Sequence, residues 1–550
     1  MAWIALSVML LLAAPFLYAE TRGATFWFDE WEWTVGRRED DPDALLEPHN
    51  SHLSLVPILL YRLLYSTFGL DVYGPYRLAL TLAHLVCVLL LFVYASRRTR
   101  GFVALLAAAS LLFLGPAWEN ILWPFQVGWL ISLGAGLGAL LLVDRGDRRA
   151  DIAASILLAV ALASSGLGLP IALGLAVDVV LGRRRLRDAW IVAAPFALYG
   201  VWWLTYQDTA LLGRLADVPG FAVDAAAASV GSLAGLAGET VPRSRGTLLT
   251  WGRPLALVAV GVLIWRLVRL GRIPPRVLAL LTIVLSFWVA TELSRGAFST
   301  AYESRYIYVG ALFAVLVAVE LARGVSISWR AGLVLGAAVT AAVISNIGIL
   351  RDAGAFLRDQ GQVTRAVLGA IEVGRPLVKP DHDLGLPGYP WVDVEAGSYF
   401  AAARADGTPA ATPAELATQP WYARREADRE LIRIHEVALE PGSADVPLGP
   451  RPEVDALTGG TVSTRGACVA FRPAAAGSDL QLAVPRAGVL ITSGRAPSKV
   501  GVRRFGDQFH AVGRLAPRAT ATLGIRADRA RQPWHARLET TRPLTVCGLS

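Results

Sequence analysis

Residues 76–100 read YRLALTLAHLVCVLLLFVYASRRTR, an apolar run that ends in three closely spaced arginines. A helix of about twenty apolar residues spans the hydrocarbon core of a bilayer. Similar runs recur through the first 350 residues, and the candidate spans are 2–19, 76–96, 101–115, 126–143, 151–165, 168–181, 189–205, 251–268, 277–291, 306–322 and 331–349. The sequence therefore predicts a polytopic α-helical membrane protein with about eleven spans.

The composition favours the same class. Of the 550 residues, 54% are hydrophobic and 17% are charged, whereas a soluble protein carries roughly a quarter of its residues as charges. All basic residues except Lys379 and Lys499 are arginines, which is typical of a GC-rich genome. The sequence pI of about 9.6 is therefore no sign of nucleic-acid binding, and no nucleic-acid partner is expected.

The arginines are distributed unevenly between alternate loops. Sixteen arginines fall within 37 positions in the loops 97–100, 144–150, 182–188, 266–276 and 323–330, whereas the intervening loops hold nine in 127 positions. Because basic residues collect on the cytoplasmic side, we expect a multi-pass protein of the cytoplasmic membrane with its N-terminus inside and residues 350–550 outside. Residues 1–19 are either retained as the first span or cleaved as a signal peptide, and both alternatives give this topology.

Residues 53–68 form one more apolar stretch, which is too short for a span and contains Pro57 and Arg62. A span here would reverse the side of every arginine-rich loop. We therefore expect a helix that lies along the outer membrane surface.

The chain divides into a membrane domain over 1–350, a mixed linker region over 351–460 and a small extracytoplasmic domain over 461–550. The linker region is rich in Pro, Gly and Asp, with one helical stretch near 422–438. Short alternating runs after residue 460 predict an antiparallel β-sandwich. Two cysteines of this part, Cys468 and Cys547, form a disulfide or remain as two thiols.

An acidic pair follows the first apolar segment, in Phe28-Asp29-Glu30-Trp31-Glu32-Trp33. Acidic side chains among aromatic residues beside a membrane are costly to keep unless they serve a function. We expect Asp29 to act as a general base toward an acceptor hydroxyl, with Glu30 holding a partner or a metal. The alternative is an ordinary polar loop.

Two arginines of the predicted outer loops, Arg305 and Arg295, are candidates for binding a phosphate. A guanidinium group offers two parallel donors that match phosphate oxygens. The alternative for each is an arginine that extends to the interface or pairs with a neighbouring Glu.

Polar residues in the short predicted outer loop 116–125 and just after it are candidates for substrate binding. Glu119, Asn120 and Gln126 lie among aromatic residues, an arrangement that suits sugar hydroxyls and C–H faces. An aromatic belt at the membrane interface explains the tryptophans equally well. His52 is a further candidate, and with His49 it either binds a divalent metal or serves as a hydrogen-bonding residue before the surface helix. No other cofactor is expected.

Three segments extend this pattern: His49-Asn50-Ser51-His52-Leu53-Ser54-Leu55-Val56-Pro57, Glu119-Asn120-Ile121-Leu122-Trp123-Pro124-Phe125-Gln126 and Ser304-Arg305-Tyr306. Together with the spans and the Asp29-Glu30 pair, they resemble uncharacterised bacterial members of the GT-C superfamily over roughly residues 1–350. These are integral membrane glycosyltransferases that use polyprenyl-phosphate-linked sugars. The Trp-Trp-Asp-Tyr-Gly motif of oligosaccharyltransferases is missing, since Trp202-Trp203 continues as Leu-Thr-Tyr.

The resemblance implies a hexosyl- or pentosyltransferase that moves a sugar from a polyprenyl-phosphate donor to an envelope glycan, lipid or protein at the outer face of the membrane. The alternatives are a transporter and a sugar-binding or envelope-assembly scaffold. A transporter is expected to carry charged or broken helices in mid-membrane, whereas the predicted spans here are nearly uncharged.

Overall fold

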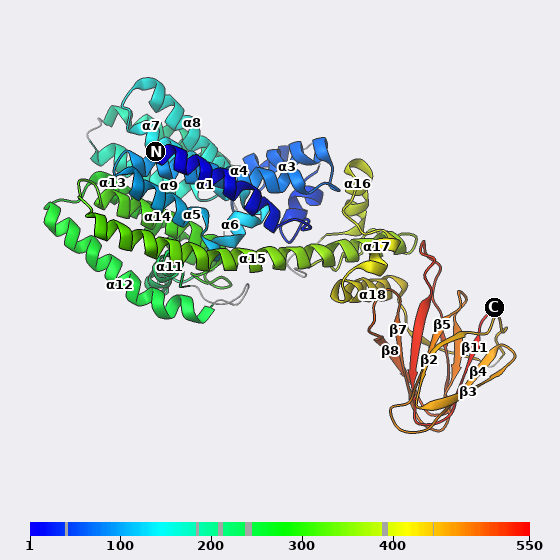
Figure 1. The fold of residues 1–550 in the computed structure, drawn as a ribbon. Helices are drawn as coiled ribbons and strands as arrows, with labels where there is room; N and C mark the ends of the chain where they lie inside the picture. The colour runs from blue at the N-terminus through cyan, green and yellow to red at the C-terminus, as the bar shows by residue number, and fades with distance from the viewer. Residues whose placement is uncertain (39–41, 183–185, 207–212, 237–244, 388–393, 444) are drawn as a thin grey trace. The chain divides into compact units, whose positions relative to one another are not determined.

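The computed structural model of the chain describes residues 1–38, 42–182, 186–206, 213–236, 245–387, 394–443 and 445–550 (Figure 1). Its contacts divide the chain into two compact units. The first unit consists of residues 1–22, 37–68 and 72–358, and the second of residues 23–36, 69–71 and 359–550. The acidic pair Asp29-Glu30 thus belongs to the second unit.

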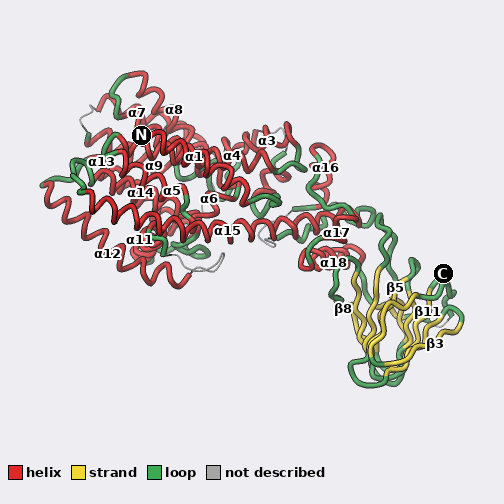
Figure 2. The backbone as a smooth tube through the Cα atoms, viewed as in Figure 1, coloured by secondary structure: helices red, strands yellow, loops and turns green. Residues whose placement is uncertain are grey.

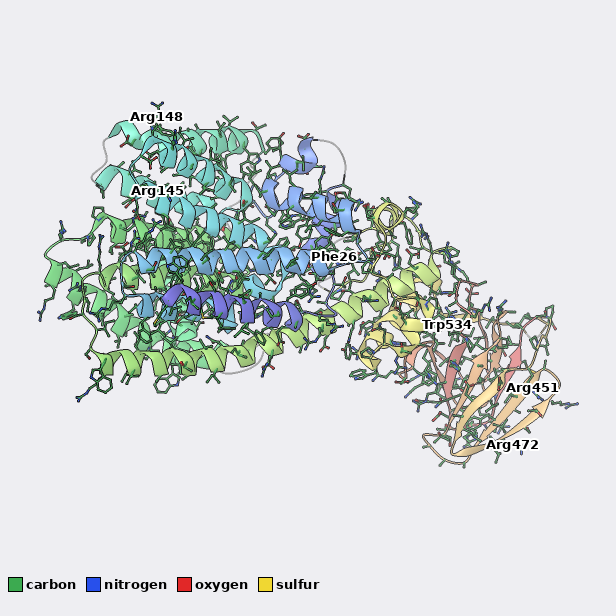
Figure 3. All side chains as sticks on the ribbon, turned by 45° about the horizontal axis from the view of Figure 1, so that its top comes forward. Phe26, Arg145, Arg148, Arg451, Arg472 and Trp534 are labelled. Atoms are coloured by element: carbon green, nitrogen blue, oxygen red, sulfur yellow. A yellow bond between two sulfur atoms is a disulfide. The ribbon has the colours of Figure 1, made fainter. Side chains whose placement is uncertain are left out.

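The first unit is helical. Its helices are α1 (Ala2–Glu20), α2 (Pro42–Leu46), α3 (Leu55–Phe68), α4 (Gly74–Ser96), α5 (Gly101–Leu112), α6 (Trp118–Leu122), α7 (Val127–Val143), α8 (Arg148–Ser164), α9 (Gly168–Leu181), α10 (Trp190–Tyr206), α11 (Val218–Leu233), α12 (Arg245–Leu270), α13 (Pro275–Arg295) and α14 (Ser304–Leu321), followed by α15 (Trp329–Gly374), whose last turns belong to the second unit. The arginine-rich connection between α7 and α8, with Arg145 and Arg148, lies at one end of this group of helices (Figure 3).

Six helical segments of the described chain are long and apolar enough to cross a membrane: α1, α4, residues 124–143, α13, α14 and α15. A seventh is added if α5 and residues 115–122, which are bent by 51°, are counted as one span. Four shorter apolar helices, α3, α9, α10 and α11, accompany them. The prediction of a polytopic helical membrane protein is confirmed.

One helix occupies a segment that the sequence analysis assigned to an outer loop. Helix α11 is rich in Ala, Ser and Gly, and its small side chains bury themselves against neighbouring helices. Ser229 and Ser232 each donate to the carbonyl oxygen four residues earlier, so their hydroxyls need no other partner. Small residues of this kind allow close helix packing without a strongly apolar sequence.

The second unit combines short helices with two antiparallel sheets (Figure 2). Its helices are α16 (Ala396–Asp406), α17 (Pro413–Thr418) and α18 (Trp421–His435). The strands are β1 (Leu439–Pro441), β2 (Glu453–Thr458), β3 (Gly460–Arg465), β4 (Cys468–Pro473), β5 (Asp479–Val484), β6 (Val489–Thr492), β7 (Ser498–Arg503), β8 (His510–Leu515), β9 (Thr520–Leu523), β10 (Trp534–Glu539) and β11 (Leu544–Gly548). The sheet orders are β1-β9-β6-β11-β4-β3 and β2-β5-β10-β7-β8.

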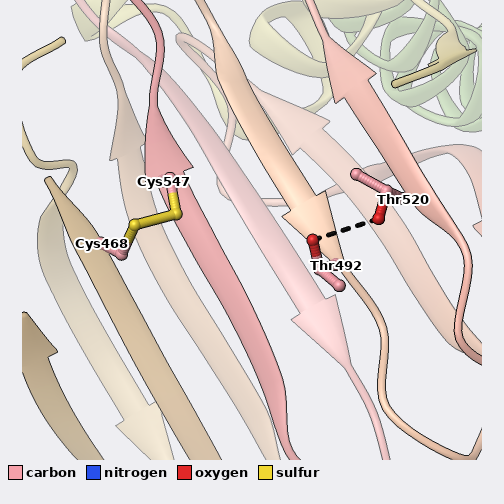
Figure 4. The surroundings of a disulfide bond; sticks show 4 residues. All are labelled: Cys468, Thr492, Thr520 and Cys547. Carbon is pink, nitrogen blue, oxygen red and sulfur yellow. Dashed lines mark hydrogen bonds between the residues drawn. A yellow bond between two sulfur atoms is a disulfide. The ribbon is translucent and has the colours of Figure 1, made fainter. Parts of the chain in front are cut away.

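The two sheets share one apolar core, which also takes in the end of α15 through Ala366, Ala370 and Val373. A disulfide joins Cys468 to Cys547 in the neighbouring strands β4 and β11 (Figure 4). Between the sheets and α18, the buried carboxylate of Asp428 accepts three backbone N–H groups of the segment after β7. The predicted C-terminal sheet domain and the helix near 422–438 are confirmed, and of the two alternatives for Cys468 and Cys547 the structure has the disulfide.

Candidate functional site

The segment between α5 and α7 is a bent, buried structure and not an exposed loop. Residues 114–128 are all buried, and α6 is flanked by single 3-10 turns at 115–117 and 124–126. Prolines at positions 116 and 124 begin these turns, since proline breaks a continuing helix but fits the first turn of a new one. A Cβ atom on Gly115 would lie 2.3 Å from the carbonyl oxygen of Asn346, so only glycine permits this approach to α15.

The aromatic residues of this segment, Trp118, Trp123 and Phe125, are buried side chains. An aromatic belt at a membrane interface would leave them accessible, so that alternative does not describe them. The rings of Trp123 and Phe125 stack with centroids 4.9 Å apart, and His49 meets the edge of Phe125 at 5.4 Å. The segment is therefore packed against the turn that precedes α3.

Glu119 and Arg305, both predicted as site residues, form an ion pair. Nε of Arg305 lies 3.4 Å from Oε2 of Glu119, and about a quarter of the arginine side chain (27%) is accessible. The hydroxyl of Ser304 accepts a hydrogen bond from the backbone N–H of Glu119 at 3.0 Å. The start of α14 and the start of α6 are thereby held together. Ser304 had no predicted role, because nothing in its own sequence context indicates a contact with Glu119.

Two carboxamides of the same buried segment are unsatisfied. The side chains of Asn120 and Gln126 are fully buried, and neither carboxamide has a hydrogen-bond partner among the described residues. A buried polar group without a partner costs about 1–3 kcal/mol. Such groups are rare in native proteins, and a bound ligand or water usually satisfies them.

A tight turn of His49, Asn50, Ser51 and His52 forms the next part of the site. The backbone groups of His49 and His52 bond each other at 2.9 and 3.0 Å, and the two central residues have positive φ values of 52° and 66°. Positive φ at two consecutive non-glycine residues stores conformational strain, which is typical of functional sites. Asn and Ser are short polar residues, and asparagine in particular tolerates this backbone conformation.

Arg295, at the end of α13, is tied to the same turn. Its Nη2 donates to the backbone oxygen of Asn50 at 2.6 Å. Burial, followed by the charges of Arg295 and His49, lowers the pKa of His52 to about 3. His52 is therefore neutral at physiological pH. It also packs against Gly166, where a Cβ atom would lie 2.5 Å from Nδ1 of His52.

The acidic pair lies in a strained segment of the second unit. Glu30 is fully buried, and its Oε2 accepts the backbone N–H of Trp27 at 3.0 Å. Asp29 is only half-buried. Phe28, just before it, has a φ of 52°, and residues 32–36 form a π-helical turn. Strained residues and π-turns both concentrate at functional sites. Glu30 therefore stabilises the turn, and Asp29 is the more accessible carboxylate.

The structure thus brings six of the eight predicted site residues into the first unit, where Glu119 contacts Arg305 and Arg295 holds the turn of His52. Asp29 and Glu30 lie in the second unit. Within the described part of the chain, no group of three or more His, Cys, Asp and Glu side chains is arranged to hold a metal ion. Nε2 of His49 instead lies 2.9 Å from the Asn50 carboxamide.

No family model matches the sequence, and no curated protein matches it. Among solved structures, the chain is similar to ArnT from Cupriavidus metallidurans, with 13% identity, a TM-score of 0.44, and 74% of this chain and 90% of that chain covered. It is also similar to the arabinosyltransferase EmbB from Mycobacterium smegmatis, with 12% identity, a TM-score of 0.36, and 99% of this chain and 64% of that chain covered. A third similar structure is the arabinofuranosyltransferase AftD from Mycobacteria, with 13% identity, a TM-score of 0.35, and 98% of this chain and 61% of that chain covered.

Proposed function

We propose that the protein is a membrane glycosyltransferase that moves a sugar from a polyprenyl-phosphate donor to an acceptor of the cell envelope at the outer face of the membrane. The observation that carries this proposal is the pair of buried, unsatisfied carboxamides of Asn120 and Gln126, in the segment whose Glu119 forms an ion pair with Arg305. Amide groups both donate and accept, as sugar hydroxyls require, and a guanidinium group matches a phosphate.

In the proposed reaction, an acceptor hydroxyl attacks the anomeric carbon of the donor sugar. The bond between that carbon and the phosphate oxygen breaks, and the lipid phosphate leaves with the bonding electrons. Asp29 takes the proton of the attacking hydroxyl, a role that suits the accessible carboxylate of the pair. Arg305, oriented by Glu119, stabilises the negative charge that grows on the phosphate.

The remaining site residues have positioning roles in this proposal. Arg295 fixes the turn of residues 49–52 through the Asn50 carbonyl, and the neutral His52 presents a hydrogen-bonding ring to the substrate. Neutral imidazole has one donor and one acceptor nitrogen, which suits a sugar hydroxyl as well. Glu30 stabilises the segment that presents Asp29.

The experiment follows a labelled sugar from synthetic polyprenyl phosphate into envelope material, in membranes of cells that lack the native protein. Asp29→Asn keeps the size of the side chain but removes the proton acceptor, so transfer should fall by about 10²–10⁴-fold. Glu32→Gln, three positions along the same segment, is the matched control and should retain transfer. Full activity of a well-expressed Asp29→Asn protein would exclude Asp29 as the base. A wild-type protein that transfers no sugar from any polyprenyl-phosphate donor would exclude the proposed reaction.

One observation favours a transporter as the second candidate. The helical segment of α5 and residues 115–122 is bent by 51° next to the buried residues Glu119 and Asn120, and broken helices of this kind build the substrate sites of transporters. Uptake or flipping of a labelled lipid-linked sugar by reconstituted protein, without covalent transfer, would favour this function over the first.

A further inference from the structure

We infer that the first unit binds one anionic phospholipid in a cavity between α11, α12, α13 and α14. The cavity has a volume of about 800 Å³. Its walls are almost entirely apolar and include Val230, Ala256, Leu263, Trp265, Leu281 and Phe313. This site does not depend on the proposed transferase activity.

Two contacts fix α12 beside the cavity. Near its start, α12 packs tightly on α11, where a Cβ atom on Gly252 would lie 2.2 Å from the carbonyl oxygen of Ala227. Toward its other end, Arg266 bonds the end of α14, since its Nε donates to the backbone oxygen of Leu321 at 3.0 Å. The residues of α12 that line the cavity lie between Gly252 and Arg266 and include Arg266 itself.

Water is a poor occupant for such a space. At roughly 30 Å³ per molecule, about 27 waters would fill 800 Å³, and each needs two to four polar partners that apolar walls do not offer. An empty space of this size would forfeit the dispersion contacts of its lining. Many side chains on α12, including Leu257, Val258 and Ile264, are exposed, as expected for a helix that faces lipid. A hydrocarbon chain from the bilayer is therefore the occupant that fits the cavity.

The charge at one end of the cavity selects the class of lipid. Arg266 lines the cavity, Arg269 lies over the ring of Trp265, which also lines it, and the backbone oxygen of Arg323 accepts a hydrogen bond from Arg266. No acidic side chain among the described residues pairs with any of these three arginines. The nearest carboxylate on α14, that of Glu320, is already held by Tyr94 and Arg98. This end therefore suits a lipid with an anionic phosphate headgroup.

The location separates this lipid from the proposed donor. Arg266 and Arg269 lie in the last turns of α12 and Arg323 lies just after α14, on the side that the arginine asymmetry predicts to be cytoplasmic. Arg305 lies in the first turn of α14, at its opposite end, and the cavity lining on that helix runs from Gly310 to Leu321. The headgroup thus belongs to the leaflet opposite the one in which we propose that the donor phosphate is cleaved.

The test measures lipids that remain bound to the full-length protein in native mass spectrometry, after detergent purification and addition of phosphatidylglycerol or phosphatidylcholine with identical chains. About 1 kcal/mol per arginine near a headgroup corresponds to roughly fivefold stronger retention, so wild-type protein should retain one phosphatidylglycerol at least about fivefold more strongly than phosphatidylcholine. Arg266→Gln should reduce this preference toward equal retention. Ala314→Trp fills the cavity and should abolish retention of both lipids.

Two matched variants complete the test. Arg253→Gln removes one charge near the other end of α12, and Ala290→Trp adds the same volume at an exposed position of α13 that does not line the cavity. Both should retain phosphatidylglycerol as wild-type protein does. Equal retention of the two lipids by wild-type protein, or undiminished binding by Ala314→Trp, would overturn the inference. Displacement of phosphatidylglycerol by polyprenyl phosphate would also overturn it, because the cavity would then belong to the donor. A failed transfer assay leaves the result intact, since the readout is bound lipid mass.

Discussion

Nε of Arg305 lies 3.4 Å from Oε2 of Glu119, although α14 and α6 are far apart in the sequence. Arg305 is the second residue of its helix, and Ser304, the first, accepts a hydrogen bond from the N–H of Glu119. The carboxylate therefore fixes the direction of the guanidinium group, while part of the arginine stays accessible. An arginine restrained in this way is prepared to meet an anionic group without losing further side-chain entropy on binding.

Substitutions of Arg305 test this role. Arg305→Ala should lower transfer by about 10²–10³-fold, since removing one donor to a developing negative charge has an effect of that size. Arg305→Lys keeps the charge but loses the planar fork, so its loss should be smaller. Arg330 provides the control, because it is exposed and its guanidinium group lies over the ring of Trp329. Arg330→Ala should retain transfer. Equal losses for Arg305→Lys and Arg305→Ala would argue against recognition that depends on charge.

Substitutions of Asn120 and Gln126 should affect stability and transfer activity in different ways. Because neither group has a described partner, Asn120→Leu and Gln126→Met should leave thermal stability unchanged or raise it, while transfer falls by about tenfold or more. Unfolding of the purified protein in detergent and the transfer assay measure the two effects.

Asn346 is the matched control for these two substitutions. It is also buried, but its Nδ2 donates to the carbonyl oxygen of Ser232 at 3.1 Å. Asn346→Leu should therefore destabilise the protein by about 0.5–1.5 kcal/mol, because it removes this hydrogen bond, although the Ser232 carbonyl still accepts the backbone N–H of Gly235. If Asn120→Leu destabilises the protein as much as Asn346→Leu does, the Asn120 carboxamide has a structural partner and not a ligand.

The neutral state of His52 predicts how transfer depends on pH. Burial, Arg295 and His49 lower the pKa of His52 to about 3, so wild-type protein should show no ionisation of this residue between pH 4 and 8. Arg295→Gln removes one positive neighbour, and the pKa of His52 should move part of the way back toward 6.5. Transfer by that variant should then decline as the pH falls below the new value, because His52 becomes protonated.

The pH–rate profile of the double variant Arg295→Gln, His52→Gln tests whether the decline in transfer at low pH comes from His52. It should lose the new acidic limb, since no imidazole remains at position 52. A limb that persists in the double variant would belong to another group. The lowered pKa of His52 also makes the stability of the protein depend on pH. Below about pH 6.5 the unfolded chain binds a proton at His52 and the folded chain does not, so the free energy of unfolding decreases from there toward pH 3.

The sequence was sufficient where local pattern determines structure. The apolar run before Arg97 forms α4, and the alternating runs after residue 460 form strands. The sequence failed where tertiary packing decides. Residues 116–125 contain no long apolar run and were predicted as an outer loop, but they are buried, and the neighbouring Gly115 packs closely on α15.

Helix α11 escaped prediction for a related reason. Its burial depends on small side chains fitting neighbouring helices and not on a strongly apolar face. The strand β2 was also missed, since it lies in the Pro- and Gly-rich region before residue 461. Its residues are all exposed and show no alternating apolar pattern, and its hydrogen bonds come from pairing with β5. Candidate residues were found from their chemistry, but the contact between Glu119 and Arg305 is non-local. No spacing in the sequence could predict it.

The side of the membrane on which the sheet domain lies remains a prediction, and its cysteines make it easy to test. Cys87 is buried and Cys468 is bonded to Cys547, so an introduced cysteine is the one accessible thiol among the described residues. Arg451→Cys lies on the exposed surface of the sheet domain, and Arg148→Cys lies at the exposed start of α8, beside the arginine-rich connection from α7 (Figure 3). In intact cells a membrane-impermeant maleimide should label Arg451→Cys, whereas Arg148→Cys should react only after lysis. The reverse labelling pattern would place the sheet domain in the cytoplasm, where a structural disulfide is rarely maintained. It would also contradict the predicted topology on which the proposed transfer at the outer face depends.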